Sequence, residues 1–251
     1  MAEKVARVES TTEIAPSVLE LQLRCVEPAA LAYKPGQFVS VRTDASGSVR
    51  RSYSIASHPR RDQGGSLELL VKLVPGGVGS TFFEHLRAGD EVHFTGPLGF
   101  FVPDPRHEGD VVFAVTGAGI AAALPMLDDI LGRTHEQGRV LLFWGLRHED
   151  DLYWQGRLAA LEALAGPRFQ THIWLSAPSP AWTGQRGRIT APVLAAVPEL
   201  AQPVFYVVGN GDMIRDVRDG LLALGIDRKK QFRNEVFYPA AKPASAQAAS
   251  C

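Results

Sequence analysis

The sequence predicts two domains, an antiparallel β-barrel followed by an α/β domain with a doubly wound, mostly parallel sheet. In the first part of the 251-residue chain, short strand-like runs follow one another between turn residues. Beyond Asp110, continuous apolar runs alternate with helical stretches, which is typical of βαβ units. Between the two parts, VPDPRHEGD (102–110) has prolines and charges but no periodicity, as expected of a linker. We therefore place the domains at residues 1–103 and 110–238, and expect residues 239–251 to form a mobile tail.

Six runs rich in apolar and β-branched residues predict the strands of the barrel, with turn residues between them. The predicted strands are 4–9, 18–25, 37–42, 49–55, 67–74 and 91–95. The one helix expected here, 80–86, follows the glycine-rich turn PGGVGST (75–81). Amide groups of such a turn can hold a phosphate at the start of a helix. A tight turn that binds nothing is the alternative explanation for these glycines.

In the second domain, apolar runs predict parallel strands and the segments between them predict helices. The strands are 111–115, 140–144, 169–175 and 204–208, and the helices are 121–131, 152–165, 191–197 and 213–224. Ligands of such sheets bind outside the carboxyl ends of the strands. Two glycine-bearing turns follow strands at that edge, VTGAGIAAALP (115–125) and VVGNGDMI (207–214). They predict a nucleotide site, because bare backbone and a helix amino terminus suit a pyrophosphate.

The stretch RSYSIAS (51–57) combines a cation, an aromatic ring and hydroxyl groups on one predicted strand. This set suits a ligand with phosphates and a flat ring. Alternation along a strand places Arg51 and Tyr53 on one face, and Ser52 and Ser54 on the other. An ordinary edge strand explains the stretch equally well when it is taken alone.

The composition narrows the classes of partner. With 26 basic and 27 acidic residues the net charge is -1, so nucleic acid is not expected as a partner. No apolar run has the length of a membrane span, and the amino-terminal residues lack the apolar core of a signal peptide. We therefore expect a cytoplasmic protein without a membrane partner. Cys25 and Cys251 have no metal-ligand spacing, so no metal site is expected in this chain, and any metal centre would lie in a partner.

In their order along the chain, these motifs resemble the ferredoxin-NADP reductase superfamily of flavoproteins. Bacterial ferredoxin or flavodoxin reductases and the reductase modules of aromatic-ring oxygenases are the most similar groups. The matching stretches are PGQFVSV (35–41), RSYSIAS (51–57), GGVGS (76–80), GPLG (96–99), TGAGIA (116–121) and GNGDMI (209–214). The resemblance covers nearly the whole chain. It implies an FAD-binding barrel followed by an NAD(P)-binding domain, with FAD as cofactor and NADPH or NADH as substrate.

The resemblance also assigns roles around the flavin. It implies that Arg51 neutralises the FAD phosphates, that Tyr53 packs on the isoalloxazine ring and that Ser54 places its hydroxyl near flavin N5. Because Tyr53 and Ser54 alternate along the strand, a local twist is needed for both to reach one ring. The resemblance also implies that Val71 and Lys72 contact the flavin largely through their backbone. The other residues implied for the FAD site are Ser52 and, in the pyrophosphate turn, Gly77, Val78 and Ser80.

For the coenzyme, the resemblance implies two turns and a phosphate subsite. The residues are Thr116, Gly117, Gly119 and Ile120 in the first turn, Gly209, Asp212 and Met213 in the second, and Ser176 with Arg186 or Arg188 near a 2′-phosphate. FRNEVFYP (232–239) resembles the family's closing strand, where Glu235 could assist proton transfer and Phe237 or Tyr238 could cover a flavin ring. A surface glutamate and core aromatic residues are the alternative explanation.

Three positions depart from the family pattern. Ala122 stands where proline is common, Val208 replaces the usual cysteine, and Ser176 is followed by Ala177 instead of arginine. The expected function is an FAD-dependent oxidoreductase that takes hydride from NAD(P)H and passes electrons to a separate ferredoxin, flavodoxin or oxygenase component. The departures leave two alternatives open, a noncatalytic nucleotide sensor or adaptor, and an electron-transfer subunit of a larger complex.

Overall fold

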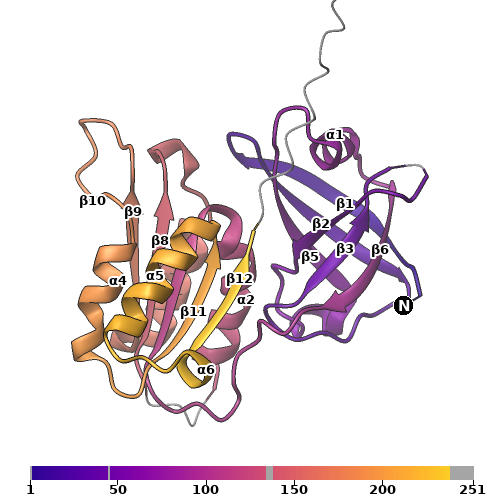
Figure 1. The fold of residues 1–251 in the computed structure, drawn as a ribbon. Helices are drawn as coiled ribbons and strands as arrows, with labels where there is room; N and C mark the ends of the chain where they lie inside the picture. The colour runs from indigo at the N-terminus through magenta and orange to yellow at the C-terminus, as the bar shows by residue number, and fades with distance from the viewer. Residues whose placement is uncertain (1, 45, 134–137, 238–251) are drawn as a thin grey trace, which may run out of the picture.

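The computed structural model describes residues 2–44, 46–133 and 138–237. Two six-stranded sheets lie side by side, one formed by the first hundred residues or so and one by the rest (Figure 1). The predicted fold class is confirmed. The exact domain limits stay a prediction, and Tyr238 and the expected tail 239–251 fall outside the described residues.

The first sheet is antiparallel throughout, in the order β4-β3-β6-β1-β2-β5. Its strands are β1 (Lys4–Ala15), β2 (Val18–Glu27), β3 (Phe38–Arg42), β4 (Arg50–Ser54), β5 (Ser66–Lys72) and β6 (Glu91–Leu98). The two edges meet just after β4, where Ile55 pairs with Leu69 and the Ala56 amide donates to the Glu68 carbonyl at 2.8 Å. This bridge closes the sheet into a barrel at the end of β4.

Alternating apolar residues fill this barrel. Its buried core includes Leu21, Val41, Leu67, Leu69 and Phe94, each no more than 1% exposed. Helix α1 (Val78–His85) packs on the barrel through Phe83, which is 1% exposed. The helix begins two residues earlier than predicted, directly after Gly77.

The second sheet is parallel throughout, in the order β10-β9-β8-β7-β11-β12. Its strands are β7 (Val111–Thr116), β8 (Val140–Leu146), β9 (Phe169–Leu175), β10 (Gln185–Arg186), β11 (Val204–Gly209) and β12 (Phe232–Val236). Its helices are α2 (Ile120–Leu131), α3 (Gln155–Ala165), α4 (Thr190–Ala196), α5 (Gly211–Ala223) and α6 (Arg228–Gln231). Helices α2 and α3 cover one face, whereas α4 and α5 cover the other (Figure 1). Side chains that alternate along β7 and β11 enter the two cores in turn, as both faces are buried.

The start of α3 differs from the sequence prediction. A helix was expected from residue 152, but the chain forms a separate 3₁₀ turn at Glu149–Asp151, and α3 begins only at Gln155. Trp154 interrupts the helix because its backbone is left-handed, with φ at +55°. Helical periodicity alone does not reveal such a residue, since a tryptophan with positive φ is held by tertiary contacts.

The two domains share one buried cluster. Val18, Ala56 and Leu70 of the barrel belong to the same core as residues of α2 and β7. Gly36 approaches α2 so closely that a Cβ there would lie 2.8 Å from the Met126 sulfur. The domain boundary is therefore a packed interface between the barrel and the α2–α3 face.

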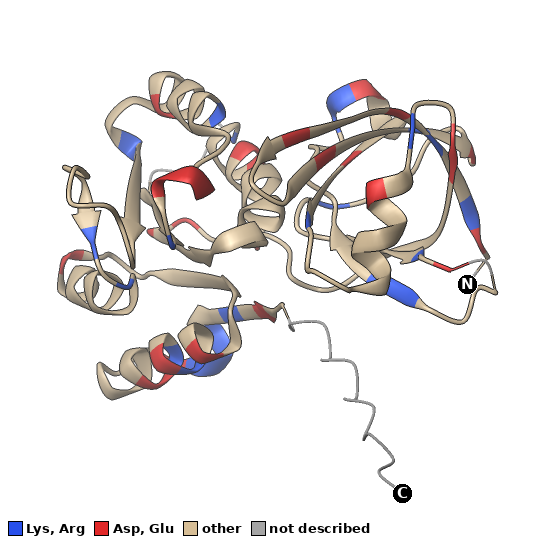
Figure 2. Cartoon of the chain, turned by 90° about the horizontal axis from the view of Figure 1, so that it is seen from above, with Lys and Arg blue, Asp and Glu red and all other residues tan. Residues whose placement is uncertain are grey.

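Acidic and basic positions are interspersed over both domains (Figure 2). Within the ranges that the structure covers, no helix has the length and apolar character to cross a membrane. The same ranges contain no group of three or more His, Cys, Asp or Glu side chains arranged to hold a metal ion.

Candidate active site at the domain boundary

The predicted catalytic residues Ser54 and Glu235 come from different domains and meet at their boundary. Ser54 ends β4 and is 5% exposed, and its hydroxyl oxygen finds no hydrogen-bond partner with good geometry among the described residues. Glu235 lies on β12, beside Val208 of β11. A Cβ at Gly99 would lie 3.8 Å from Glu235 Oε2 and 3.0 Å from the Phe38 ring, and Phe38 pairs with Ser54 across the barrel sheet. The carboxyl therefore reaches into the barrel end where Ser54 lies.

The environment of Glu235 changes its acidity. Burial raises the pKa of the carboxyl to about 7, and the Ser54 hydroxyl that faces it lowers the pKa by a smaller amount. Ser54 Oγ has no hydrogen-bond partner with good geometry among the described residues, so its contact with the Glu235 carboxyl is not a well-formed hydrogen bond. A carboxyl with this pKa can hold or release a proton near neutral pH.

Arg51 and Tyr53 lie against the start of α1. A Cβ at Gly79 would be 2.9 Å from the Tyr53 hydroxyl and 3.2 Å from Arg51 Cγ, so only glycine permits this approach. Tyr53 also contacts Phe83 edge to face, with 4.8 Å between the ring centroids. Burial raises the pKa of Tyr53 to about 12, which keeps the phenol protonated as a donor. The Arg51 guanidinium donates to the Arg50 carbonyl and has no carboxylate partner in the described part of the chain.

The turn before α1 presents backbone beside this arginine. Gly77 occupies the N-cap position without a side-chain cap, and Val78 is 48% exposed. Ser80 is buried and accepts a hydrogen bond from the Val74 amide at 2.7 Å, so its hydroxyl stabilises the conformation of the turn. A helix amino terminus without a side-chain cap, next to a guanidinium without a carboxylate partner among the described residues, suits a phosphate group.

The strand β5 supplies the other two residues expected near the flavin. Val71 is 1% exposed and its side chain belongs to the barrel core, so any contact with a ligand involves its backbone. Lys72 is exposed, and its ammonium group donates to the Pro16 carbonyl at 2.9 Å. Ser52, in the middle of β4, is exposed and pairs with Ser40.

The two glycine-bearing turns of the α/β domain are in direct contact. Gly209 has φ at +126°, and a Cβ there would lie 2.3 Å from Thr116 Oγ1. Thr116 Oγ1 accepts a hydrogen bond from the Asn210 amide at 2.9 Å. A Cβ at Gly119 would lie 2.8 Å from the Val208 carbonyl. These glycines permit the close approach of β7 and β11 at the point where the strand order reverses, which is where such sheets bind ligands.

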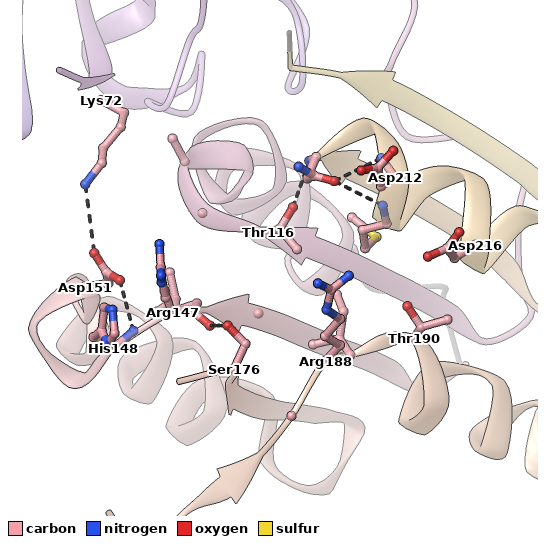
Figure 3. Close-up of a pocket in the computed structure, with 18 of the residues that line it drawn as sticks. Lys72, Thr116, Arg147, His148, Asp151, Ser176, Arg188, Thr190, Asp212 and Asp216 are labelled. Carbon is pink, nitrogen blue, oxygen red and sulfur yellow. Dashed lines mark hydrogen bonds and ion pairs between the residues drawn. The ribbon is translucent and has the colours of Figure 1, made fainter. Parts of the chain in front are cut away.

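A cavity of about 620 Å³ opens at this edge of the sheet (Figure 3). Among the residues that line it are Thr116, Gly117, Ser176, Arg188, Asp212 and Met213, all named for the coenzyme site from the sequence. The lining also includes Lys72, Arg147, His148, Asp151, Tyr153, Asn210 and Asp216. Arg147 and Arg188 project into the space between Asp151 and Asp212 (Figure 3). Neither guanidinium has a partner within the described residues, so both are available to an anion.

Some predicted residues lie away from the cavity. The Arg186 guanidinium donates to the carbonyls of Ser179, Pro180 and Trp182, and it does not line the cavity, whereas Arg188 does. Ile120 is fully buried behind the first turn, where it packs in the core. Phe237 follows β12 and packs against the interdomain core while its amide donates to the Gly209 carbonyl at 2.8 Å.

Comparison with known proteins agrees with this architecture. The sequence matches the model of an oxidoreductase FAD-binding domain over residues 5–102 and that of an oxidoreductase NAD-binding domain over residues 113–219. Ferredoxin--NADP reductase B of Sorangium cellulosum (strain So ce56) is 32% identical over 232 residues, which cover 89% of this chain and 93% of that protein. The chain belongs to the ferredoxin-NADP reductase superfamily. It is an NAD(P)H-dependent flavoprotein reductase with FAD as its cofactor.

Two further matches come from Amycolatopsis. The aromatic O-demethylase reductase subunit of Amycolatopsis sp. (strain ATCC 39116 / 75iv2) is 37% identical over 190 residues, which cover 73% of this chain and 55% of that protein. The crystal structure of Amycolatopsis cytochrome P450 reductase GcoB superposes with a TM-score of 0.85 at 30% identity, over 96% of this chain and 71% of that chain. The reductase thus spans little more than half the length of the first Amycolatopsis protein.

The residues present fit FAD. Arg51 offers a cation without a carboxylate partner in the described ranges, Gly79 lets this arginine lie against the start of α1, and that helix start offers amide groups to a pyrophosphate. The unsatisfied Ser54 hydroxyl lies farther along β4, where a polar ring atom of a ligand would complete its hydrogen bonding. Phosphate and ring contacts are thus spaced along one strand.

Sequence reasoning missed several residues of the reductase's coenzyme cavity. Arg147 and His148 follow β8, which the prediction ended at residue 144, two residues before its observed end. Extending that strand would have placed both at the carboxyl edge, where ligand contacts are expected. Asn210 caps α5 by accepting from the amides of Asp212 and Met213. An asparagine before a helix is a standard capping signal, so this role was readable from the sequence.

Proposed function

We propose that this reductase transfers electrons from NAD(P)H, through its FAD, to a separate one-electron acceptor protein such as a ferredoxin, a flavodoxin or an oxygenase component. The observation that carries the proposal is the unsatisfied Ser54 hydroxyl facing the Glu235 carboxyl at the domain boundary. The acceptor class is supported by the relatives, which are named as a ferredoxin--NADP reductase and as the reductase subunit of an aromatic O-demethylase. When bound, FAD supplies the conversion between two-electron and one-electron transfer.

In this proposal the barrel residues orient the cofactor. Arg51 and the amides of Gly77 and Val78 bind its pyrophosphate, while Ser80 keeps that turn in shape. Tyr53 packs beside the ring system, and Ser54 donates to a ring nitrogen. Ser52, Val71 and Lys72 complete the site, Val71 only through its backbone.

The α/β residues hold the coenzyme. The backbone of the first turn, residues 116–119, and the start of α5 bind its phosphates and nicotinamide ribose. Asp212 and Met213 lie at the wall of the cavity. Ser176, Arg147 and Arg188 contact the coenzyme ribose that carries the 2′ substituent. Arg186 stabilises the loop before Arg188 from outside the cavity.

Glu235 controls protons at the reacting centre. Its pKa of about 7 allows the carboxyl to be protonated in part of the population at neutral pH, so it can exchange a proton with bound cofactor. The packed interface around Ala56 and Leu70 excludes water from this region.

The two alternatives differ from this proposal in specific ways. A nucleotide sensor needs no buried carboxyl with a neutral pKa beside an unsatisfied hydroxyl, so the Ser54–Glu235 arrangement favours an enzyme over a sensor. A subunit of a larger complex would use the same chemistry with a permanently bound acceptor.

A cytoplasmic location belongs to the proposal as well, because NAD(P)H is a cytoplasmic electron donor.

The test is coenzyme-driven reduction of purified acceptors by the FAD-loaded full chain. A plant-type [2Fe–2S] ferredoxin, a flavodoxin and ferricyanide are compared with NADH and with NADPH. The proposal expects turnover with ferricyanide and with at least one of the proteins. FAD that is reduced by neither coenzyme, or that never passes electrons to ferricyanide, would contradict it.

A further inference from the structure

The segment between the 3₁₀ turn Glu149–Asp151 and α3 contacts both domains. Tyr153 donates from its hydroxyl to the Gly117 carbonyl at 3.3 Å, and Gly117 belongs to the first coenzyme turn. The next residue, Trp154, donates from its indole nitrogen to Glu20 Oε2 of the barrel at 2.6 Å. Two consecutive side chains therefore connect the coenzyme turn of one domain to a strand of the other.

Arg157, in the first turn of α3, extends this connection to a buried carboxylate. Glu68 of β5 is 0% exposed, and its carboxylate accepts from Gln22 at 2.8 Å and from Arg61 at 3.3 Å within the barrel. Arg157 donates from both of its terminal nitrogens to the Glu68 carboxylate, one of them at 3.2 Å. It also forms an ion pair with Glu20 at 3.0 Å. A buried carboxylate requires such partners, because an unpaired charge is strongly disfavoured away from water.

The guanidinium is itself held in place. Its central carbon lies 4.6 Å from the Trp154 ring centroid, in a cation–π contact. Trp154 in turn keeps φ at +55°, a conformation that is rare for a tryptophan and persists only when surrounding contacts fix it. The contact of Lys72 with Asp151, at 3.9 Å, joins the same segment to the end of β5 (Figure 3).

The backbone of Glu68, whose carboxylate Arg157 binds, is hydrogen-bonded to the residues that follow β4. The Glu68 carbonyl accepts from the Ala56 amide at 2.8 Å, and the Glu68 amide donates to Ser57 Oγ at 3.1 Å. Ser54 lies only two residues before Ala56 on this stretch. Arg157 is thus linked through one residue, Glu68, to the backbone that carries Ser54, and through Trp154 and Tyr153 to the turn that carries Gly117.

We propose that Arg157 is a positioning residue for hydride transfer, which fixes the coenzyme turn at Gly117 relative to Ser54 by binding Glu68 and Glu20 across the domain boundary. The proposal rests on the proposed function and concerns a residue that does not line the coenzyme cavity. Hydride transfer demands close alignment of donor and acceptor, so a small displacement of one domain lowers the transfer rate more than it lowers affinity for either nucleotide.

The test compares Arg157→Met with Arg139→Met in the FAD-loaded full chain. Arg139 pairs with the buried carboxylate of Asp110 at 3.0 Å, but both residues belong to the α/β domain, so this variant removes a similar ion pair without affecting the boundary. Stopped-flow reduction at saturating coenzyme gives the limiting rate, and its concentration dependence gives the apparent Kd. Hydrogen exchange of the FAD-free proteins reports on residues 116–119 and 151–157 without requiring any activity.

We expect Arg157→Met to lower the limiting rate roughly 10- to 100-fold with the apparent Kd changed less than about threefold. We also expect faster exchange in both segments, and neither change in Arg139→Met. The proposal is overturned if both variants lose thermal stability alike and keep limiting rates within about twofold of the wild type.

Milder variants cover the case in which Arg157→Met does not fold. Arg157→Lys keeps the charge but not the two-pronged contact, and Glu20→Gln keeps an acceptor for Trp154. Both should show intermediate limiting rates and intermediate exchange, and wild-type values in both would overturn the proposal. If wild-type FAD is reduced by neither coenzyme, the proposed function fails, while the exchange of the FAD-free variants still decides whether Arg157 links the two segments.

Discussion

The hydroxyl of Ser54, at the end of a barrel strand, faces the carboxyl of Glu235, on the last strand of the α/β domain. The two residues are 181 positions apart in the sequence, and each is brought to the boundary by its own sheet. Their proximity joins the cofactor half of the site to the coenzyme half. A separate prediction follows for each of the two side chains.

Ser54→Ala should leave FAD bound while slowing its reduction by coenzyme. The hydroxyl contributes a positioned polar contact at the reacting centre, and its loss should cost about 10- to 100-fold in the limiting rate, or about 1.4–2.7 kcal/mol. Stopped-flow absorbance measures this rate, with Ser40→Ala on the neighbouring strand as the control. If FAD content falls and the remaining holoenzyme is reduced at the normal rate, Ser54 has only a structural role.

Arg51→Ala should weaken FAD binding. Removal of the unpaired guanidinium leaves phosphate charge uncompensated, at a cost of about 1.5–3 kcal/mol, or roughly 10- to 150-fold in Kd. Titration of the FAD-free protein with FAD measures the change. Arg50→Ala is the matched control, because Arg50 lies one residue away but forms an ion pair with Glu3. An unchanged Kd in Arg51→Ala would remove this residue from the site.

Glu235→Gln should flatten the dependence of stability on pH. The pKa of Glu235 in the folded protein is about 7, above its ordinary value of 4.5, so the folded state holds this proton more tightly than the unfolded state. The resulting stability is fully present below pH about 4.5 and is lost as the pH rises to about 7, with a total on the order of 3 kcal/mol. Chemical unfolding of the FAD-free protein between these pH values measures it. Parallel curves for the wild type and Glu235→Gln would show that the carboxyl has an ordinary pKa.

Coenzyme choice should not be strongly selective for NADPH, and NADH should be usable. The arginine that commonly follows Ser176 is absent, and a long flexible side chain loses freedom when it binds a phosphate. Arg188→Ala should lower kcat/KM for NADPH more than for NADH, because Arg188 lines the cavity. Arg186→Ala should have a smaller effect, since that guanidinium is engaged with three backbone carbonyls. A wild-type preference for NADPH of about a thousandfold, roughly 4 kcal/mol, would contradict this prediction.

The sequence was sufficient for the fold class because its local patterns were unambiguous. The apolar runs at β7 and β11 and the short alternating strands of the barrel identified both architectures, and Gly209 and Gly119 marked turns that the structure requires to be glycine. Strand ends were less certain, since β8 continues beyond its apolar run to Leu146. That error hid Arg147 and His148.

Contacts between the domains could not be predicted from the sequence. Arg157 and Glu68 appear as ordinary charged residues in a helix and a strand, and only tertiary structure brings them together. The left-handed conformation of Trp154 has the same origin. Arg186 and Arg188, separated by one glycine, look equivalent in the sequence, and only the loop conformation shows that Arg188 lines the cavity while Arg186 donates to backbone carbonyls.

The most direct test of the account is an anaerobic visible spectrum of the full chain, reconstituted with FAD, before and after addition of NADH and of NADPH. We expect bound FAD that survives desalting and loses its oxidised absorption on addition of at least one coenzyme. A protein that retains no FAD, or whose bound FAD stays oxidised with both coenzymes, would contradict it.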